Sequence, residues 1–221
     1  MKQRIVLSLV FVCAFMVTTR AQISKGAVWV GGSIGYNQTK QDPGIYNGKP
    51  YKTTTLTINP SIGTAVKDNL VVGIELLYNQ IKTENDGNSV KSKTNAYGGG
   101  VFVRKYFPVI TRLYIFGDAN AAYAATKNDR TLSTGTNPIV VTAKGGITSV
   151  GITPGIAFAV SKKFMLETSL NNLFSVAYTS TKTTGPTDYY KSKSSQFAAG
   201  VFADGKAQFN IGVRFLLGNK G

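Results

Sequence analysis

Two neighbouring stretches of this chain, Leu56–Val66 and Leu70–Tyr78, alternate residue by residue between two kinds of side chain. One set of positions is mostly aliphatic, and the set between them is mostly Gly, Ser, Thr and Asn. A period of two residues is that of a β-strand whose two faces meet unlike surroundings. The pattern therefore predicts a hairpin turning at 67–69, which a soluble barrel and a membrane barrel would both contain.

The polar face of these strands carries few charges. A face in contact with bulk water is normally rich in Lys and Glu. We expect the lysines to lie in the connections instead, namely Lys40, Lys49, Lys52, Lys82, Lys91, Lys93, Lys182, Lys191 and Lys193. A narrow barrel with short side chains in its lumen and an apolar, lipid-facing outside accounts for both observations.

Eight stretches show this alternation. They are Ala27–Asn37, Leu56–Val66, Leu70–Gln80, Asn95–Phe107, Leu113–Thr126, Ile147–Val160, Phe164–Tyr178 and Ala207–Leu217. Connections after the second, fourth and sixth are short, whereas the others are long and polar, as in up-and-down membrane barrels. The predicted fold is all-β, an eight-stranded antiparallel up-and-down transmembrane β-barrel. Pro60 and Pro154 lack a backbone donor and predict bulges or bends, and 197–202 could extend the last strand.

The first residues have the pattern of a secretory signal. Lys2 and Arg4 precede the apolar run Ile5–Val17, and small residues end at Ala21. We therefore predict a signal peptide over 1–21 and a barrel domain over 22–221, exported across the inner membrane to the cell outer membrane. The only cysteine, Cys13, is followed by more apolar residues, which disfavours a lipid anchor. Later in the chain no apolar run is long enough for a membrane helix.

The chain is strongly basic. It has 25 Lys and Arg against 10 Asp and Glu, a net charge of +15, and no histidine. Such a balance favours an anionic neighbour. The lysines form no single basic helix or stripe, so nucleic acid is not expected. Outer-membrane lipid, lipopolysaccharide or acidic surface polysaccharide are the expected partners, and the alternative is that the lysines only keep the loops soluble.

A few charges fall inside strands, on the lumen side. They are Glu75, Arg104, Asp118, Glu167 and Arg214. Because an unpaired charge in a narrow lumen is costly, opposite signs should be neighbours. The structural interpretation is an internal ion-pair network, and the functional one is a charged constriction in a pore. Barrels of about eight strands are filled by side chains, which favours the structural interpretation.

Catalytic chemistry has little support. Without histidine the chain lacks the usual general base and the commonest metal ligand. Glu75 and Glu167 could act as paired carboxylates, but two arginines on the same face favour neutralisation. Gly98–Gly100 continues into a strand rather than a helix, which argues against a phosphate loop. We predict no catalytic, cofactor-binding or metal residues, no cofactor and no enzyme.

Many aromatic residues fall near the predicted strand ends, which suggests the girdles of a membrane barrel. They are Trp29, Tyr36, Tyr78, Tyr97, Tyr106, Phe107, Tyr123, Phe164, Tyr178 and Phe215. A sugar-binding platform is the alternative. Its candidates are Tyr46, Tyr51, Tyr189 and Tyr190, which lie in predicted loops.

The segment Val101–Pro108, followed by Tyr114–Ala119, resembles the strand-turn-strand centre of the small, porin-like outer-membrane β-barrel domain family, and Pro60–Gly73 resembles the preceding hairpin. The resemblance implies an eight-stranded barrel in a Gram-negative outer membrane, usually without an assigned activity. Asp118 stands where the family more often has a longer acid, which implies a weaker reach to Arg104. The chain also continues past Phe215, whereas such barrels often end on an aromatic insertion signal.

These observations favour a non-enzymatic, monomeric, integral outer-membrane barrel with a structural or surface-interaction role and basic external loops. One alternative is a soluble lipocalin-like barrel, in which the Val, Ile and Leu face would line a ligand cavity. Another is a small porin-type pore.

Overall fold

The computed structural model describes residues 23–41, 51–85, 91–134, 137–171, 173–201 and 208–219. Ten strands and one short 3-10 helix make up these segments. They are β1 (Val28–Gln41), β2 (Tyr51–Lys67), β3 (Leu70–Asn85), β4 (Lys91–Ile110), β5 (Leu113–Thr134), β6 (Asn137–Ser161), β7 (Phe164–Asn171), β8 (Phe174–Thr184), η1 (Asp188–Tyr190), β9 (Ser192–Val201) and β10 (Gln208–Leu217).

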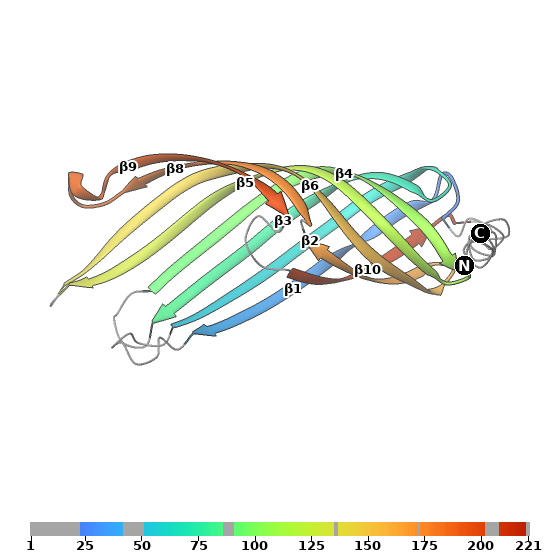
Figure 1. The fold of residues 1–221 in the computed structure, drawn as a ribbon, viewed down its shortest axis with the longest axis horizontal. Coiled ribbons are helices and arrows are strands. Elements are labelled where there is room, and N and C mark those ends of the chain that lie inside the picture. The colour runs from blue at the N-terminus through green and yellow to red at the C-terminus, as the bar shows by residue number, and fades with distance from the viewer. Residues whose placement is uncertain are drawn as a thin grey trace, which may run out of the picture.

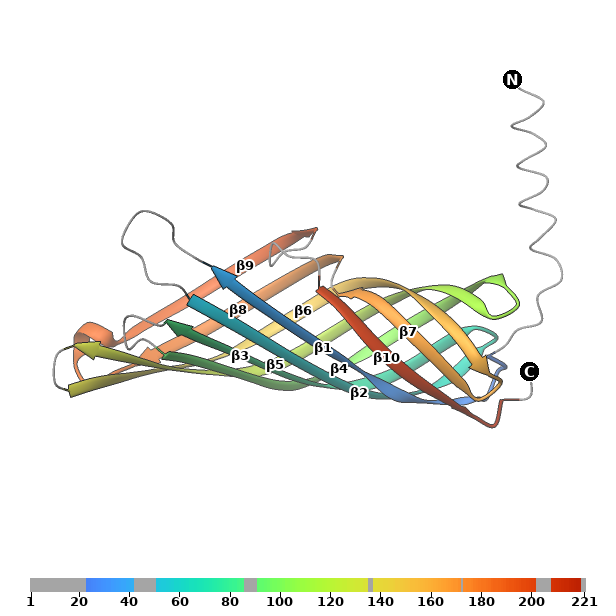
Figure 2. The same cartoon turned by 90° about the horizontal axis from the view of Figure 1, so that it is seen from below.

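Eight of these strands close into an antiparallel ring. Neighbours pair in the order β1 to β7, then β10, and β10 returns to β1. The strands run steeply tilted along an elongated barrel (Figures 1 and 2). The ring confirms the predicted eight-stranded antiparallel fold.

The predicted seventh strand is interrupted. β6 pairs with β8 up to Ile152 and with β7 from Gly155 onward, and the register differs by two residues between the two pairings. Pro154 lies in this gap, where the missing N–H of proline removes a ladder hydrogen bond. The single strand expected over Phe164–Tyr178 is therefore two strands, β7 and β8.

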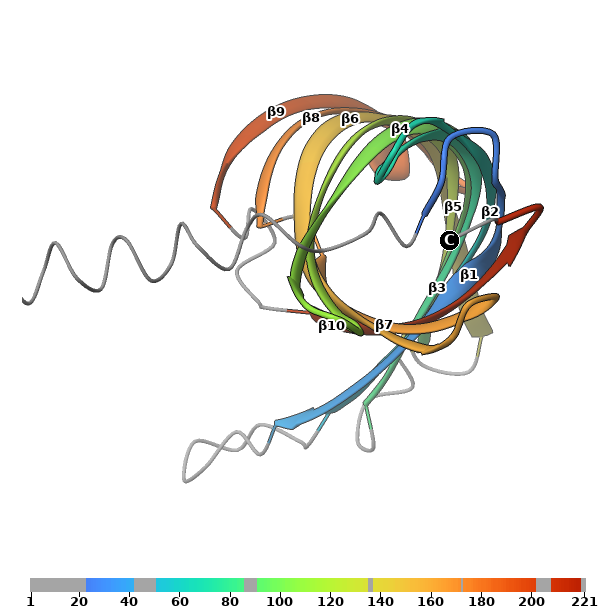
Figure 3. The same cartoon turned by 90° about the vertical axis from the view of Figure 1, so that its right-hand side faces the viewer.

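The barrel is closed at one end and open along a seam at the other. β1 pairs with β10 only as far as Ile34, and its remaining residues pair with β2 alone. β9 pairs only with β8. Among the described residues these two edges have no strand partner, and Figure 3 shows β8 and β9 curving away from the closed ring.

The tight turns are placed as predicted, at Asp68–Asn69, Thr111–Arg112 and Lys162–Lys163. Asn69 adopts a left-handed φ of 58°. Each hairpin has a register shift beside its turn, between 65 and 67, 108 and 110, and 159 and 161. Pro60 leaves the β2–β3 register unchanged, so the bulges belong to the turns.

On the side away from the tight turns, the strands extend well past their predicted ends. Lys40, Lys52, Lys82, Lys91, Lys93, Lys182 and Lys193 lie inside strands rather than in connections, which corrects the sequence prediction. Lys191 precedes β9, and Lys49 is outside the described residues. Apolar alternation stops where both faces meet water, but the Thr-rich sequence there still favours extended backbone. The predicted polar connection after the seventh strand likewise contains the first half of β9.

The apolar positions point outward, as predicted. Ile74 is 57% exposed, Leu76 63% and Val101 56%, although the lumen residues between them are covered. A lipocalin-like barrel would need these side chains inside, so the structure contradicts that alternative. None of the helices in the described segments is long and apolar enough to span a bilayer.

The lumen near the turns contains an apolar and aromatic core rather than only short polar side chains. Trp29 and Tyr106 are fully buried in it. Both were predicted to belong to an interfacial girdle, and that prediction is wrong for them. The apolar run near the turns hid their inward orientation, because both faces of the strands are apolar there. Met165, Leu216, Val71, Phe102, Tyr114 and Phe116 complete the core.

Candidate functional site in the barrel lumen

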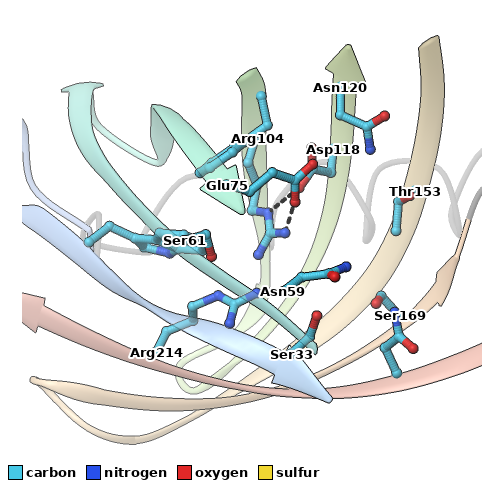
Figure 4. Close-up of a pocket in the computed structure, with 13 residues that line it drawn as sticks. Ser33, Asn59, Ser61, Glu75, Arg104, Asp118, Asn120, Thr153, Ser169 and Arg214 are labelled. Carbon is cyan, nitrogen blue, oxygen red and sulfur yellow. Dashed lines mark hydrogen bonds and ion pairs between the residues drawn. The ribbon is translucent and has the colours of Figure 1, made fainter. Parts of the chain in front are cut away.

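A small polar cavity lies directly above this aromatic core. It has a volume of about 40 Å³, and its lining comes from strands around the whole ring. Figure 4 shows Arg104 and Asp118 from adjacent strands, with Glu75 beside them and Arg214 on the other side of the cavity. All five charged residues predicted for the lumen are inside the barrel, and four of them form ion pairs with one another.

Arg104 bridges two acids. It faces Asp118 directly across the β4–β5 pair. Its Nε and Nη2 atoms donate to Asp118 Oδ2 at 2.9 and 2.5 Å. The third nitrogen, Nη1, donates to Glu167 Oε2 at 2.7 Å. The shorter acid thus reaches Arg104 fully, contrary to the weaker contact implied by the family resemblance, because the register places the two residues opposite each other.

Arg214 approaches the same acid from β10. Its Nε atom lies 3.1 Å from Glu167 Oε2. Its Nη1 atom donates to the carbonyl oxygens of Gly32 and Val213. Glu167 is therefore shared by two arginines on opposite sides of the ring, and these contacts link β4, β5, β7 and β10.

Tyr106 and Trp29 extend the network into the core. The Tyr106 hydroxyl donates to Glu167 Oε1 at 2.5 Å and accepts from Trp29 Nε1 at 3.0 Å. The guanidinium carbon of Arg104 lies 4.3 Å from the centre of the Phe116 ring, and that of Arg214 lies 4.4 Å from the Trp29 ring. Aromatic faces stabilise desolvated cations, so the core and the charges above it form one packed unit.

Phe116 packs closely against a glycine on the neighbouring strand. A Cβ on Gly155 would overlap the Phe116 ring. The absence of a side chain at Gly155 lets this ring lie flat across the lumen beneath Arg104. Figure 4 shows polar residues that line the cavity, among them Asn59, Asn120 and Thr153.

Glu75 lies apart from the ion pairs. It lines the cavity, but none of the ion pairs among the described residues involves it. Asp118 Oδ1 is also without a hydrogen bond among the described atoms. A cavity of this size holds one or two water molecules, and both carboxylates border it.

The geometry fits a plug better than a catalytic or conducting site. The buried carboxylates of Asp118 and Glu167 are held by the guanidinium groups of Arg104 and Arg214. Within the described part of the chain, no group of three or more acidic, His or Cys side chains could hold a metal ion. The ion-paired side chains and the aromatic core beneath them occupy the lumen at this level, and the cavity beside them has a volume of about 40 Å³.

Sequence reasoning found the charges but missed Tyr106 and Trp29 as their partners. The signal was present for Tyr106, because it lies two residues from Arg104 and must share its face of β4. Trp29 lies between Val28 and Val30, where the alternation gives no contrast.

A family comparison identifies the class of barrel. The model of the outer membrane protein beta-barrel domain matches residues 7–215. The chain belongs to this outer-membrane β-barrel family. The match covers the ring as far as Phe215 in β10 and includes all five lumen charges. The predicted signal peptide over 1–21 lies outside the described residues and stays a prediction, as does its boundary with the barrel domain.

Structural comparison finds solved structures at very low sequence identity. The translocator domain of the autotransporter NalP from Neisseria meningitidis has a TM-score of 0.49 and 10% identity, with 97% of this chain and 95% of that chain covered. A triple mutant of the Rhodopseudomonas blastica porin has a TM-score of 0.14 and 12% identity, with 86% and 99% covered. No curated protein matches the chain.

Proposed function

We propose that this protein is a non-enzymatic and non-conducting outer-membrane barrel. Its role is structural, and it presents basic strands above the bilayer. The observation that carries the proposal is the lumen plug. Arg104, Glu167 and Arg214 join opposite sides of the ring above a packed aromatic core.

A plug of this kind gives the barrel a fixed shape. Buried ion pairs contribute little net stability when complete, but removing one partner leaves an uncompensated charge. The chain contains no histidine, and two of the three lumen acids, Asp118 and Glu167, are held by arginines, which supports a role without catalysis.

Planar-bilayer recording tests the non-conducting role. The purified protein should insert and give no stable current above that of the protein-free bilayer. Heat-modifiable migration on gels and fractionation with the outer membrane would show that the sample is folded and inserted. A steady wild-type current that Arg104→Ala alters would overturn the plug and favour the alternative of a small pore.

A further inference from the structure

The outward face of four adjacent strands carries a straight row of lysines. Cross-strand register places Lys127 on β5 opposite Lys144 on β6, Lys144 opposite Lys182 on β8, and Lys182 opposite Lys193 on β9. We call these four residues the lysine row. Neighbouring strands lie about 4.8 Å apart, so four positive charges are aligned across roughly 15 Å.

Such a row is unfavourable unless something negative covers it. Like charges directly opposite each other across strands repel. Lys127 has a partner, because its Nζ atom lies 2.8 Å from Asp129 Oδ2. Hydrogen bonds from Lys127 and Thr142 lower the pKa of Asp129, which keeps this carboxylate ionised. Among the described residues, Lys144, Lys182 and Lys193 have no ion-pair partner.

The row stands at a defined height above an aromatic row. Four residues nearer the turns, the register aligns Tyr123, Thr148, Tyr178 and Phe197. Below them the same four strands present apolar residues, Ala121, Val150, Val176 and Ala199. Aromatic side chains of membrane barrels lie at the interface. At about 3.4 Å per residue and a tilt near 45°, the lysines stand about 10 Å above that level.

The level between the two rows is nearly bare. It consists of Ala125, Gly146, Ser180 and Ser195. The Tyr123 hydroxyl lies 2.7 Å from where a Cβ on Gly146 would be, so its ring leans up into this level. A level of small residues therefore separates the lysines from the aromatic row, and the Tyr123 hydroxyl reaches into it.

We propose that this surface binds the phosphate groups of phosphorylated lipids in the outer leaflet. The aromatic row fixes the depth, the small residues leave room for a headgroup, and the lysine row supplies the charge. Lysine binds phosphate as a point charge, and basic residues beside an anionic leaflet are attracted to it. This inference rests on the proposed role as an integral barrel and names the lipid that the basic strands would contact.

The test measures lipid retention. The full chain is reconstituted in phosphatidylcholine vesicles with a minor fraction of bisphosphorylated lipid A or of the same lipid without its phosphates. After detergent extraction, lipid bound per protein is counted by native mass spectrometry. Wild type should retain the phosphorylated form preferentially. The variant Lys144→Gln/Lys182→Gln/Lys193→Gln should lose about a hundredfold in retention, because each lysine near an anionic leaflet contributes roughly fivefold.

A matched variant removes the same charge elsewhere. Lys25→Gln/Lys162→Gln/Lys163→Gln changes three exposed lysines at the turn end of the barrel and should retain lipid as wild type does. Heat-modifiable migration of both variants checks folding. Without phosphorylated lipid, the lysine-row variant should unfold at the same or a higher temperature than wild type, because its charge repulsion is reduced.

Three results would overturn the proposal. One is equal lipid retention by the two variants. Another is equal retention by wild type of lipid A with and without its phosphates. The third is displacement of the lipid by inorganic phosphate or soluble polysaccharide at low concentration, which would assign the row to a soluble anion. None of these results depends on bilayer conductance, so they are separable from a failure of the plugged-barrel role.

Discussion

At the scale of single residues, the effect of a charge on the free energy of unfolding depends on whether it lies in the lumen or on the lipid-facing side of the barrel. Arg104 is 7% exposed and satisfied by two acids. Leu76, on the outer face of β3, is 63% exposed to the surroundings, which are lipid for an outer-membrane barrel. A substitution at either position therefore tests one side of the wall.

Arg104→Met should destabilise the barrel by about 3–5 kcal/mol, because Asp118 and Glu167 would lose a buried partner. Urea unfolding of the reconstituted protein, followed by heat-modifiable migration, measures this change. Lys162→Met, in an exposed turn, is the control and should be nearly neutral. A double-mutant cycle with Asp118→Leu should show strong coupling, and additive effects would contradict the network.

Leu76→Arg should cost about 2–4 kcal/mol, since a charge on the lipid face is expensive near the bilayer midplane. Gln80→Arg lies four residues further along the same face of β3 and should cost no more than about 1 kcal/mol. Folding yields and unfolding midpoints in vesicles compare the two variants. Equal effects would show that the apolar band does not face lipid.

At the scale of elements, hairpin turns and strand edges carry the conformational constraints. The β2–β3 hairpin depends on Asn69, whose φ is 58°. Its backbone N–H also donates to the Ile23 carbonyl oxygen at 2.9 Å, and its carbonyl accepts from the Tyr106 N–H at 2.8 Å. The turn thereby holds the first described segment over the closed end of the ring.

Asn69→Ala should lower the unfolding free energy by about 1–2 kcal/mol, because alanine disfavours the left-handed region. Asn69→Gly keeps that conformation available and should lose less. Unfolding of the two variants under the same conditions gives the comparison. Equal losses for the two variants would assign the effect to the side-chain amide, which both substitutions remove, rather than to the backbone.

The seam gives a prediction for β1. Beyond Ile34, the amides of β1 that face away from β2 have no strand partner among the described residues. Hydrogen exchange of the folded protein should therefore alternate along residues 35–41, with slow amides facing β2 and fast amides facing the seam. Uniform protection there would mean that another segment covers this edge.

At the scale of the whole molecule, the basic residues fall at both ends of an apolar band, and the orientation decides which end meets the cell surface. The tight turns and both described chain ends lie together, since Ser24 donates to Asn219 Oδ1. In outer-membrane barrels the short turns face the periplasm. The lysine row should accordingly lie on the side of the membrane that faces the cell exterior.

Single cysteines test this orientation, because the only native cysteine lies in the predicted signal peptide. On intact cells, a membrane-impermeant maleimide should label Lys193→Cys and leave Lys163→Cys unlabelled. Both should react after the envelope is disrupted. Labelling of Lys163→Cys alone on intact cells would reverse the orientation and remove the lysine row from the outer leaflet.

The sequence by itself determined where the apolar strand segments of the ring lie, the faces of their alternating residues and the three tight turns, because side-chain alternation and turn residues are local signals. Arg104 and Asp118 could be assigned to the lumen from the two-residue alternation of side chains alone. Their pairing, and the sharing of Glu167 by Arg104 and Arg214, depended on register and ring closure, which join residues far apart in the chain.

Other features were decided only by the tertiary structure. Pro154, on β6, lies opposite the break between β7 and β8, which the tertiary pairing defines. Trp29 faces inward although its surroundings in sequence are apolar on both faces. Four lysines, of which Lys182 and Lys193 were predicted to lie in loops, form a row because pairing between strands sets their common height. Alternation fixes which face a residue takes, whereas its neighbours on that face follow from the register of strands that pair at long range.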